Sequence, residues 1–183
     1  ELACAMLTQL LQKEGLVAQS APANLPVGEL LDLVAKLDPQ TVCLSVVSPS
    51  TVIQARYLCV KVKSRFPGLK IVLAHGGGVA PYLLGRWRHG HSHRPEPRVR
   101  FQGSVEEMFQ RLYFDSILYE PKVLRFLVDS MGADRVLLGT DYSGDMSCWR
   151  EVPEIRKLDF LSEKQKDQIL GENAARLLGI GES

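Results

Sequence analysis

Short apolar runs alternate along the chain with segments in which apolar side chains recur every three or four residues. The runs are rich in β-branched residues, which is typical of strands buried on both faces of a sheet. Five such strands are predicted, at residues 16–21 (the weakest of the five), 41–47, 70–74, 112–118 and 135–141.

Helices are predicted between these strands, bounded by residues that start or stop helices. Ser104 with Glu107 and Ser162 with Gln165 have the spacing of capping boxes, and Pro121 occupies a position of the first helical turn. Glycines end most of the periodic segments. The predicted helices begin near residues 2, 30, 50, 81, 104, 121 and 162.

Strands that alternate with helices indicate an α/β protein, here a single domain over residues 1–183 with a mostly parallel sheet of about five strands and flanking helices. Ligands of such sheets bind outside the carboxyl ends of the strands. The polar residues that follow each apolar run are therefore the candidates for chemistry. They are Ser45, Ser48, His75, residues 115–120 and Asp141.

His75 follows a predicted buried strand and precedes three glycines, Gly76, Gly77 and Gly78. An imidazole placed there suits a general base or a metal ligand. The glycines allow a ligand to approach the backbone and offer N–H groups to an anion. A tight strand-to-helix turn with a solvent-facing His75 explains the same residues equally well, and the sequence leaves both interpretations open.

Three further residues have one functional and one structural interpretation each. Asp141, at the end of the last predicted strand, would bind a divalent metal or orient a water, or it caps the next helix. Arg86 would bind a substrate carboxylate through two hydrogen bonds, or it is a solvated helix arginine. Tyr119 would face a ligand at its strand end, or it packs in the core or at its rim.

The segment HGHSH contains His89, His91 and His93. On a strand, an HxH pair directs both imidazoles to one face, as metal sites require. The flanking Arg94-Pro95-Glu96-Pro97 is typical of a loop instead. We expect a flexible loop that binds metal adventitiously, without a designed site.

Composition and charge exclude several classes of function. The 22 basic and 21 acidic residues argue against a dedicated nucleic-acid or anionic-lipid surface, and no apolar run is long enough to span a membrane. The 4 cysteines form no CxxC pair, so we expect mostly small core residues, a reducing compartment and a cytoplasmic location. A complete (β/α)₈ barrel of ~250 residues does not fit into 183.

From about residue 70 to residue 180 the chain resembles the C-terminal part of the amidohydrolase-related family, in particular its aminocarboxymuconate semialdehyde decarboxylase-like enzymes. The resemblance implies a TIM barrel with zinc or another divalent metal that decarboxylates or hydrolyses a small carboxylated molecule. The motifs that carry it are His75–Gly78, Leu84-Gly85-Arg86, Tyr113–Ser116, Gly132–Tyr142 and Gly171–Leu178.

The resemblance also implies roles for individual residues. His75 would be the catalytic acid/base group, Asp141 would bind the metal, and Arg86 would hold the substrate carboxylate. Tyr119, a candidate substrate-binding residue, stands where relatives have histidine. The family's metal site also needs an HxH pair and a further histidine from earlier strands. The chain has 4 histidines, His75 and those of the HGHSH segment, so this ligand set is incomplete.

Residues 1–72 more loosely resemble the flavodoxin-like domain of cobalamin-binding proteins. The cobalt-ligating Asp-x-His-x-x-Gly motif is missing, so bound cobalamin is not expected. The residues that carry this resemblance are Glu1-Leu2-Ala3, Val42–Ser45, Ala55–Cys59 and Arg65–Val72.

Together the two resemblances predict a recombined or engineered chimera without a complete active site. Residues 1–72 would be a flavodoxin-like segment, and residues 73–183 would be the last three βα units of an amidohydrolase-type barrel. One alternative is a metal-dependent decarboxylase or hydrolase whose site is completed by a partner chain, or by a homodimer formed through an open sheet edge. The other is a corrinoid- or anion-binding module that uses the Gly76–Gly78 turn.

Overall fold

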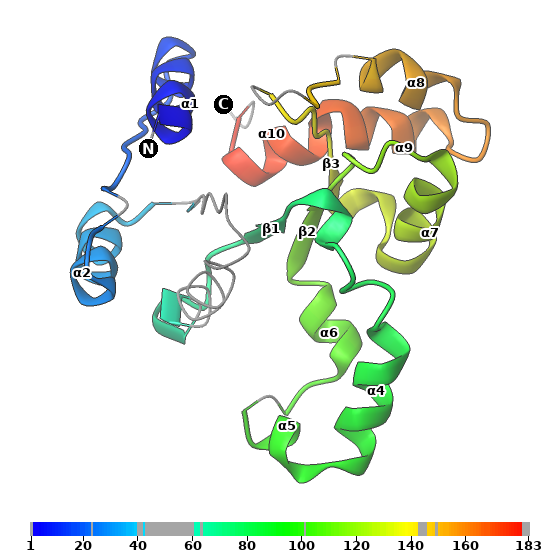
Figure 1. Cartoon of the computed structure of the whole chain (residues 1–183), viewed down its shortest axis with the longest axis horizontal. Helices are drawn as coiled ribbons and strands as arrows, with labels where there is room; N and C mark the ends of the chain where they lie inside the picture. The colour runs from blue at the N-terminus through cyan, green and yellow to red at the C-terminus, as the bar shows by residue number, and fades with distance from the viewer. Residues whose placement is uncertain are drawn as a thin grey trace. The chain divides into compact units, whose positions relative to one another are not determined.

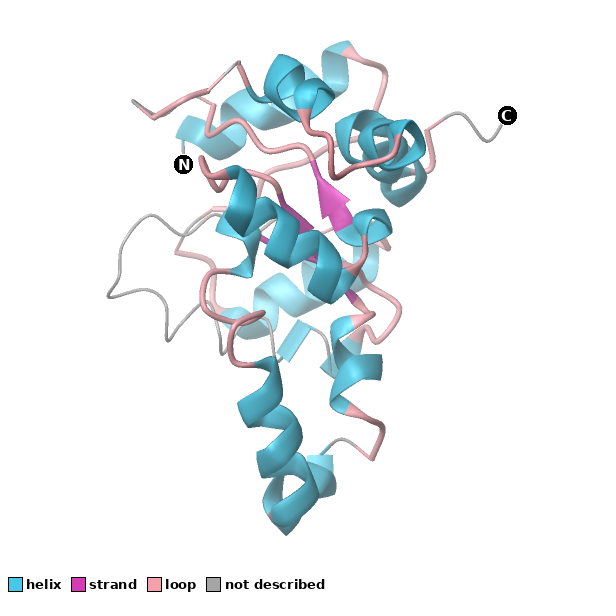
Figure 2. Ribbon diagram, turned by 90° about the vertical axis from the view of Figure 1, so that its right-hand side faces the viewer, coloured by secondary structure: helices cyan, strands magenta, loops and turns pink. Residues whose placement is uncertain are grey.

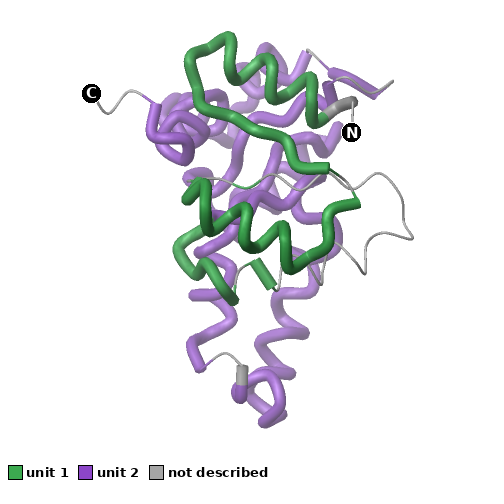
Figure 3. The backbone as a smooth tube through the Cα atoms, turned by 90° about the vertical axis from the view of Figure 1, so that its left-hand side faces the viewer, with its two compact units in different colours: residues 1–69 green, residues 70–183 purple. Residues whose placement is uncertain are grey.

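The computed structural model describes residues 2–22, 24–39, 42, 61–62, 64–100, 102–142, 146–148 and 150–180. The chain divides into two compact units, residues 1–69 and residues 70–183 (Figure 3). The division lies close to the joint predicted at residue 72. The strand predicted at residues 41–47 and most of the helix predicted from residue 50 lie outside the described residues.

The first unit contains two described helices, α1 (Leu2–Lys13) and α2 (Val27–Leu37). Its buried apolar cluster consists of Val34, Val62 and Leu69 among the described residues. The run at residues 16–21 forms no strand.

The second unit contains a parallel three-stranded sheet with the order β1-β2-β3. Helices α4 to α6 lie at one end of this unit and α8 to α10 at the other (Figure 1), and the strands are short compared with the helices (Figure 2). The elements are β1 (Ile71–Leu73), η2 (His75–Gly77), α4 (Leu84–His93), α5 (Pro95–Arg100), α6 (Val105–Phe109), β2 (Leu112–Asp115), α7 (Pro121–Met131), η3 (Ala133–Arg135), β3 (Val136–Leu137), α8 (Glu151–Lys157), α9 (Glu163–Asp167), η4 (Gln168–Glu172) and α10 (Asn173–Leu178).

The predicted class, a mixed α/β fold with a parallel sheet, is confirmed for the second unit. Three strands are present among the described residues, and the strand predicted at residues 16–21 is absent, whereas the one predicted at residues 41–47 and the flavodoxin-like arrangement of residues 1–72 stay predictions. Both predicted capping boxes form at the starts of α6 and α9, and α7 begins at Pro121 and ends before Gly132 as its pattern indicates.

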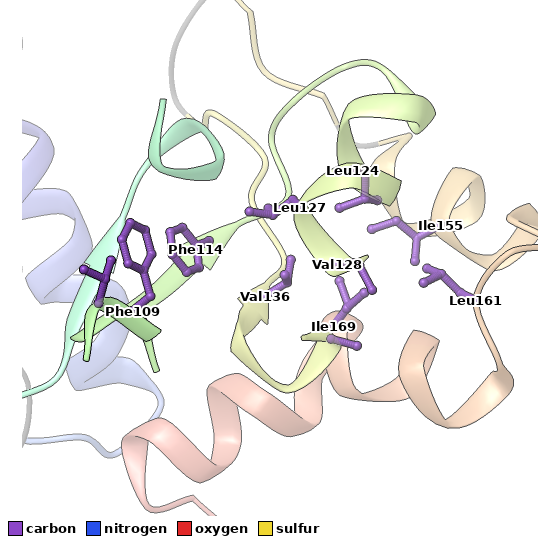
Figure 4. Packing of buried hydrophobic residues seen from close by; sticks show 11 residues of the cluster. Phe109, Phe114, Leu124, Leu127, Val128, Val136, Ile155, Leu161 and Ile169 are labelled. Atoms are coloured by element: carbon purple, nitrogen blue, oxygen red, sulfur yellow. The ribbon is translucent and has the colours of Figure 1, made fainter. Parts of the chain in front are cut away.

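The core of the second unit packs α7 and the C-terminal helices against the sheet (Figure 4). Phe114 and Val136, on β2 and β3, are fully buried, as is Ile169 of η4. Phe109 of α6 stacks on Phe114 with ring centroids 6.5 Å apart. Burial of each large side chain of this kind contributes ~1.5–3 kcal/mol to stability.

The buried amide of Asn173 joins the last helix to the last strand. Its Nδ2 donates to the carbonyl oxygens of Ala133 and Val136 at 2.8 and 2.7 Å, and its Oδ1 accepts from Arg176. Asn173 thereby fixes α10 against β3, the strand that precedes Asp141.

Several sequence predictions are wrong in this unit. The HGHSH segment belongs to α4 and is helical, although a loop was predicted, and Pro95 starts the short helix α5. A polar helix with no buried side chain has no apolar period from which it could be detected. Helix α8 was also missed. Cys148 of this unit and Cys4 of the first unit are free and half-buried, so these two cysteines are not core residues.

In the part of the chain that the structure describes, no helix is both long and apolar enough to cross a membrane.

Candidate active site

Non-glycine residues with left-handed backbone conformation follow all three strands of the described sheet. His75 follows β1 with φ 55°, Tyr119 follows β2 with φ 55°, and Asp141 follows β3 with φ 51°. The fourth such residue described, Asp38, caps the end of α2 in the other unit. This conformation costs ~1–3 kcal/mol per residue and is concentrated at functional sites in proteins. The carboxyl edge of the sheet is therefore the candidate site.

Tyr119 and Asp141 are in direct contact at this edge. The Tyr119 hydroxyl lies 2.6 Å from Oδ2 of Asp141 and 2.7 Å from the carbonyl oxygen of Met146. The phenol has one proton, so it donates to one of these acceptors at a time. The hydrogen bond to Asp141, followed by burial and the aspartate charge, raises the pKa of Tyr119 to about 12.

Ser147 and Cys148 bond back to the residues that follow β3. Ser147 Oγ donates to the carbonyl oxygen of Asp141 at 2.9 Å, and the Cys148 amide donates to the carbonyl oxygen of Thr140 at 2.8 Å. These bonds hold the backbone on both sides of the strained Asp141.

Asp115 connects the end of β2 to the turn that follows β1. Its carboxylate accepts from the amides of Gly76, at 2.9 Å, and Ile117, at 3.3 Å. Burial raises the pKa of the Asp115 carboxyl, although these amide bonds and the nearby charge of His75 oppose the shift. Asp115 is thus a positioning residue for the His75 turn.

The glycine turn after His75 needs glycine for both conformation and space. Gly77 has φ +78°, and a Cβ placed on it would lie 2.8 Å from the ring of buried Phe114. The amides of Gly76, Gly77 and Gly78 donate to Asp115, to the Ala74 carbonyl and to the His75 carbonyl, respectively. In this conformation the turn offers none of these three N–H groups to an anion.

Arg86 lies in the first turn of α4, and both its side chain and that of His75 are exposed. Among the described residues, no hydrogen bond or ion pair occupies the Arg86 guanidinium. An arginine without a partner suits bidentate binding of an external carboxylate.

A cavity of roughly 160 Å³ lies beside the Tyr119 strand end, between the starts of α7 and α8. Its lining includes the carboxylates of Glu120, Glu151 and Glu154. Burial, followed by the charge of Glu154, raises the pKa of Glu151. This cavity was not predicted from the sequence, because one of its walls is α8, which the sequence pattern does not indicate. An acidic lining does not suit an anionic substrate.

The described residues do not fit a complete metal site. No three histidine, cysteine, aspartate or glutamate side chains gather in a way that could hold a metal ion in the described part of the chain. Oδ2 of Asp141, the predicted metal ligand, accepts from Tyr119 instead. A catalytic zinc normally takes about three protein ligands.

The Amidohydrolase family model matches residues 51–180. The chain belongs to this family. The matched region includes all three strand ends and α4, and it begins upstream of residue 73, where the barrel segment was predicted to start. The flavodoxin-like front and the chimera therefore stay predictions.

Two curated relatives carry the name 2-amino-3-carboxymuconate-6-semialdehyde decarboxylase. The one from Dictyostelium discoideum is 36% identical over 117 residues, which are 63% of this chain and 33% of the relative. The one from Caenorhabditis elegans is 34% identical over 122 residues, which are 64% of this chain and 30% of the relative. The chain thus spans about a third of the length of these relatives.

Solved structures of two decarboxylases share the fold. A 5-carboxyvanillate decarboxylase from Sphingomonas paucimobilis is 26% identical with a TM-score of 0.55, over 70% of this chain and 40% of that one. A dihydroxybenzoic acid decarboxylase from Polaromonas sp. JS666 has a TM-score of 0.64 at 18% identity, over 100% of this chain and 66% of that one. At this identity the second likeness shows the fold alone.

The predicted site residues are thus brought together only in part. Tyr119 and Asp141 touch, and His75 is linked to the end of β2 through the Gly76 amide and Asp115. The contribution of Ser147 was not predicted from the sequence, because no local pattern marks a hydroxyl that bonds a carbonyl six residues earlier.

Proposed function

We propose that the chain supplies the acid–base and carboxylate-binding part of a decarboxylase site for a small carboxylated acid of the aromatic or muconate type. The observation that carries the proposal is the row of strained, non-glycine residues His75, Tyr119 and Asp141 at adjacent strand ends. The names of the two curated relatives support the reaction type.

His75 is assigned the proton transfer. When the bond between the substrate carbon and its carboxyl group breaks, carbon dioxide leaves and the electron pair stays on carbon. A proton from the His75 imidazolium then completes the product. We assign to Arg86 the binding of a second carboxylate or another anionic group of the substrate. Paired hydrogen bonds would hold this group in a fixed orientation. Tyr119 would contribute its hydroxyl at the edge of the same site.

The proposal includes a divalent metal, zinc or manganese, for which this chain supplies only part of the ligand set. Structures of the Polaromonas enzyme and of a 5-carboxyvanillate decarboxylase from Novosphingobium aromaticivorans contain manganese. In this chain Asp141 would be one ligand, but the described residues provide no complete set. The missing ligands would come from a partner chain or from a second copy of this chain. We therefore derive no step through the metal.

The proposal includes the chimera predicted above, with residues 1–72 as a flavodoxin-like segment and no complete active site within the 183 residues. The corrinoid-binding alternative is not favoured, because the amides of the glycine turn are directed to acceptors within the protein.

Substrate binding tests the proposal without requiring turnover. An aromatic dicarboxylate is titrated into the 183-residue chain and binding is followed by NMR. Arg86→Gln is expected to weaken binding at least tenfold, since a charge-assisted hydrogen bond contributes ~1.5–3 kcal/mol. Arg94→Gln, which removes an exposed arginine just beyond the end of α4, is the matched control and should change it less than twofold. Equal effects of the two substitutions would refute the assignment of Arg86.

Carbon dioxide release is then measured with added Mn²⁺ or Zn²⁺. The expected result is release no faster than without protein, because the metal ligand set is incomplete. Metal-stimulated release that survives His75→Asn would contradict both the incomplete site and the role of His75.

A further inference from the structure

The HGHSH segment forms the last turn and a half of α4, and this changes which of its histidines are neighbours. Side chains four positions apart lie on the same face of a helix, whereas those two positions apart lie on different faces. His89 and His93 are therefore neighbours, with ring centroids 4.0 Å apart and planes inclined by 30°. His91 lies on another side of the helix, near Glu106, whose pKa is lowered by a backbone hydrogen bond, then by the Arg88 side chain, and least by the charge of His91.

The spacing of the two rings suits coordination of one ion. Imidazole nitrogens bind zinc-like metals at ~2.0–2.1 Å, so two nitrogens on one ion lie no more than about 4 Å apart. The ring centroids of His89 and His93 lie 4.0 Å apart, so rotation about the side-chain χ angles brings one nitrogen of each ring within this limit. Both side chains are exposed, so an ion reaches them without any opening of the core.

The surroundings of His93 also match those of a metal-binding histidine. Its Nδ1 lies 2.9 Å from the carbonyl oxygen of His89 and 2.8 Å from Ser92 Oγ, and this hydroxyl donates to the same carbonyl oxygen at 2.9 Å. When Nδ1 carries the proton and donates to this carbonyl, Nε2 keeps its lone pair for a metal. Ligating histidines almost always donate their other N–H group to a carbonyl, carboxylate or water in this way.

The local charge selects the kind of metal. The C-terminal end of α4 carries negative partial charge, which favours a cation. Arg94 and Arg98 stand close by in the sequence, and no acidic side chain precedes them within α4. Mg²⁺ and Ca²⁺, which prefer oxygen ligands, are therefore disfavoured, whereas a metal that prefers imidazole is accepted.

We propose that the C-terminal turn of α4 is a binding site for a late first-row divalent metal ion, Cu²⁺, Ni²⁺ or Zn²⁺, with His89 and His93 as its protein ligands. The site is separate from the strand ends and independent of the proposed decarboxylase function. Water or an external donor would complete the coordination. Affinity is expected to be highest for Cu²⁺, according to the general order for nitrogen ligands.

Calorimetric titration of the 183-residue chain with NiCl₂ near neutral pH tests the site. The expected result is one Ni²⁺ per chain, with binding at least tenfold weaker in His89→Ala and in His93→Ala. His91→Ala is the matched control and should change the affinity less than twofold. Alanine has the highest helix propensity, so all three variants keep α4, which circular dichroism verifies.

A second measurement locates the metal directly. Titration with diamagnetic Zn²⁺ should shift the Nε2 resonances of two histidines in ¹⁵N-edited NMR spectra, and each should disappear in the variant that lacks that residue. The proposal is wrong if His91→Ala weakens Ni²⁺ binding as much as His89→Ala does, if His89→Ala binds with unchanged affinity, or if the chain binds no Ni²⁺.

Discussion

Replacement of Asn173 by alanine tests how strongly the last helix is fixed to the sheet. The substitution removes the amide that donates to the carbonyl oxygens of Ala133 and Val136 and leaves both acceptors without this donor. Asn173 and Val136 are fully buried and Ala133 is 6% exposed, so water does not easily replace the lost donor.

The expected loss of stability follows from these contacts. The Ala133 carbonyl keeps the Val136 amide as a donor, so the main loss is the Asn173 bond to the buried Val136 carbonyl, which costs ~1–3 kcal/mol. Arg176→Ala is the matched control, because it removes only the exposed guanidinium that donates to Asn173 Oδ1. Its expected effect is below about 1 kcal/mol.

Urea unfolding followed by tryptophan fluorescence measures both effects in the intact chain. Both tryptophans, Trp87 and Trp149, belong to the second unit, so the signal reports the unit that contains Asn173. With a typical urea dependence of ~1–3 kcal/mol per molar, Asn173→Ala should lower the transition midpoint by about 1 M. A loss no larger than that of Arg176→Ala would refute the reasoning that these buried carbonyl bonds hold α10 to β3.

Three further predictions concern the strand ends. Gly77→Ala should lower the unfolding free energy by at least ~1–3 kcal/mol, through its φ of +78° and the clash with buried Phe114, and an unchanged urea midpoint would contradict this. The pKa of Asp115 is raised in the folded state, so its contribution to stability rises as pH falls through that pKa and is complete below 3.8. The unfolding free energies of wild type and Asp115→Asn should therefore diverge on acidification. Parallel curves of unfolding free energy against pH would exclude the shift. Ultraviolet titration should show one tyrosine, Tyr119, that ionises near pH 12 and at a lower pH in Asp141→Asn. The stabilisation by the Tyr119 hydroxyl should persist below pH 10 and disappear as pH approaches 12. Ionisation of all 5 tyrosines near pH 10 would contradict the hydrogen bond.

Elements with local signals were predictable from the sequence. The helix starts are marked by local features, namely the capping boxes of Ser104 and Ser162 and the position of Pro121 in the first helical turn. No tertiary information is needed to predict them. The apolar runs before His75 and Asp141 likewise indicated where strands end. The structure begins and ends these strands inside the predicted ranges, because only part of each run finds a neighbouring strand to pair with.

The features that define the candidate site were less accessible to the sequence. The contact between Tyr119 and Asp141 joins residues from different strand ends, and the left-handed conformation of both is imposed by the surrounding fold. The part of helix α4 after His89 was not predicted as helical, because the helix buries no side chain. The neighbours of its histidines therefore became clear only from the structure.

The parallel sheet has the same order in space as in sequence, and this has a consequence for how the protein folds. Phe114 and Val136, partners across β2 and β3, are about half as far apart in the chain as Ile71 and Leu112, partners across β1 and β2. Loop closure costs ~0.6 kcal/mol less for each halving of the loop. We therefore expect β2, α7 and β3 to form the earliest structured nucleus, to which β1 is added later. In pulse-labelled hydrogen exchange the β2–β3 amides should be protected before those of β1, whereas earlier protection of β1 would contradict this order.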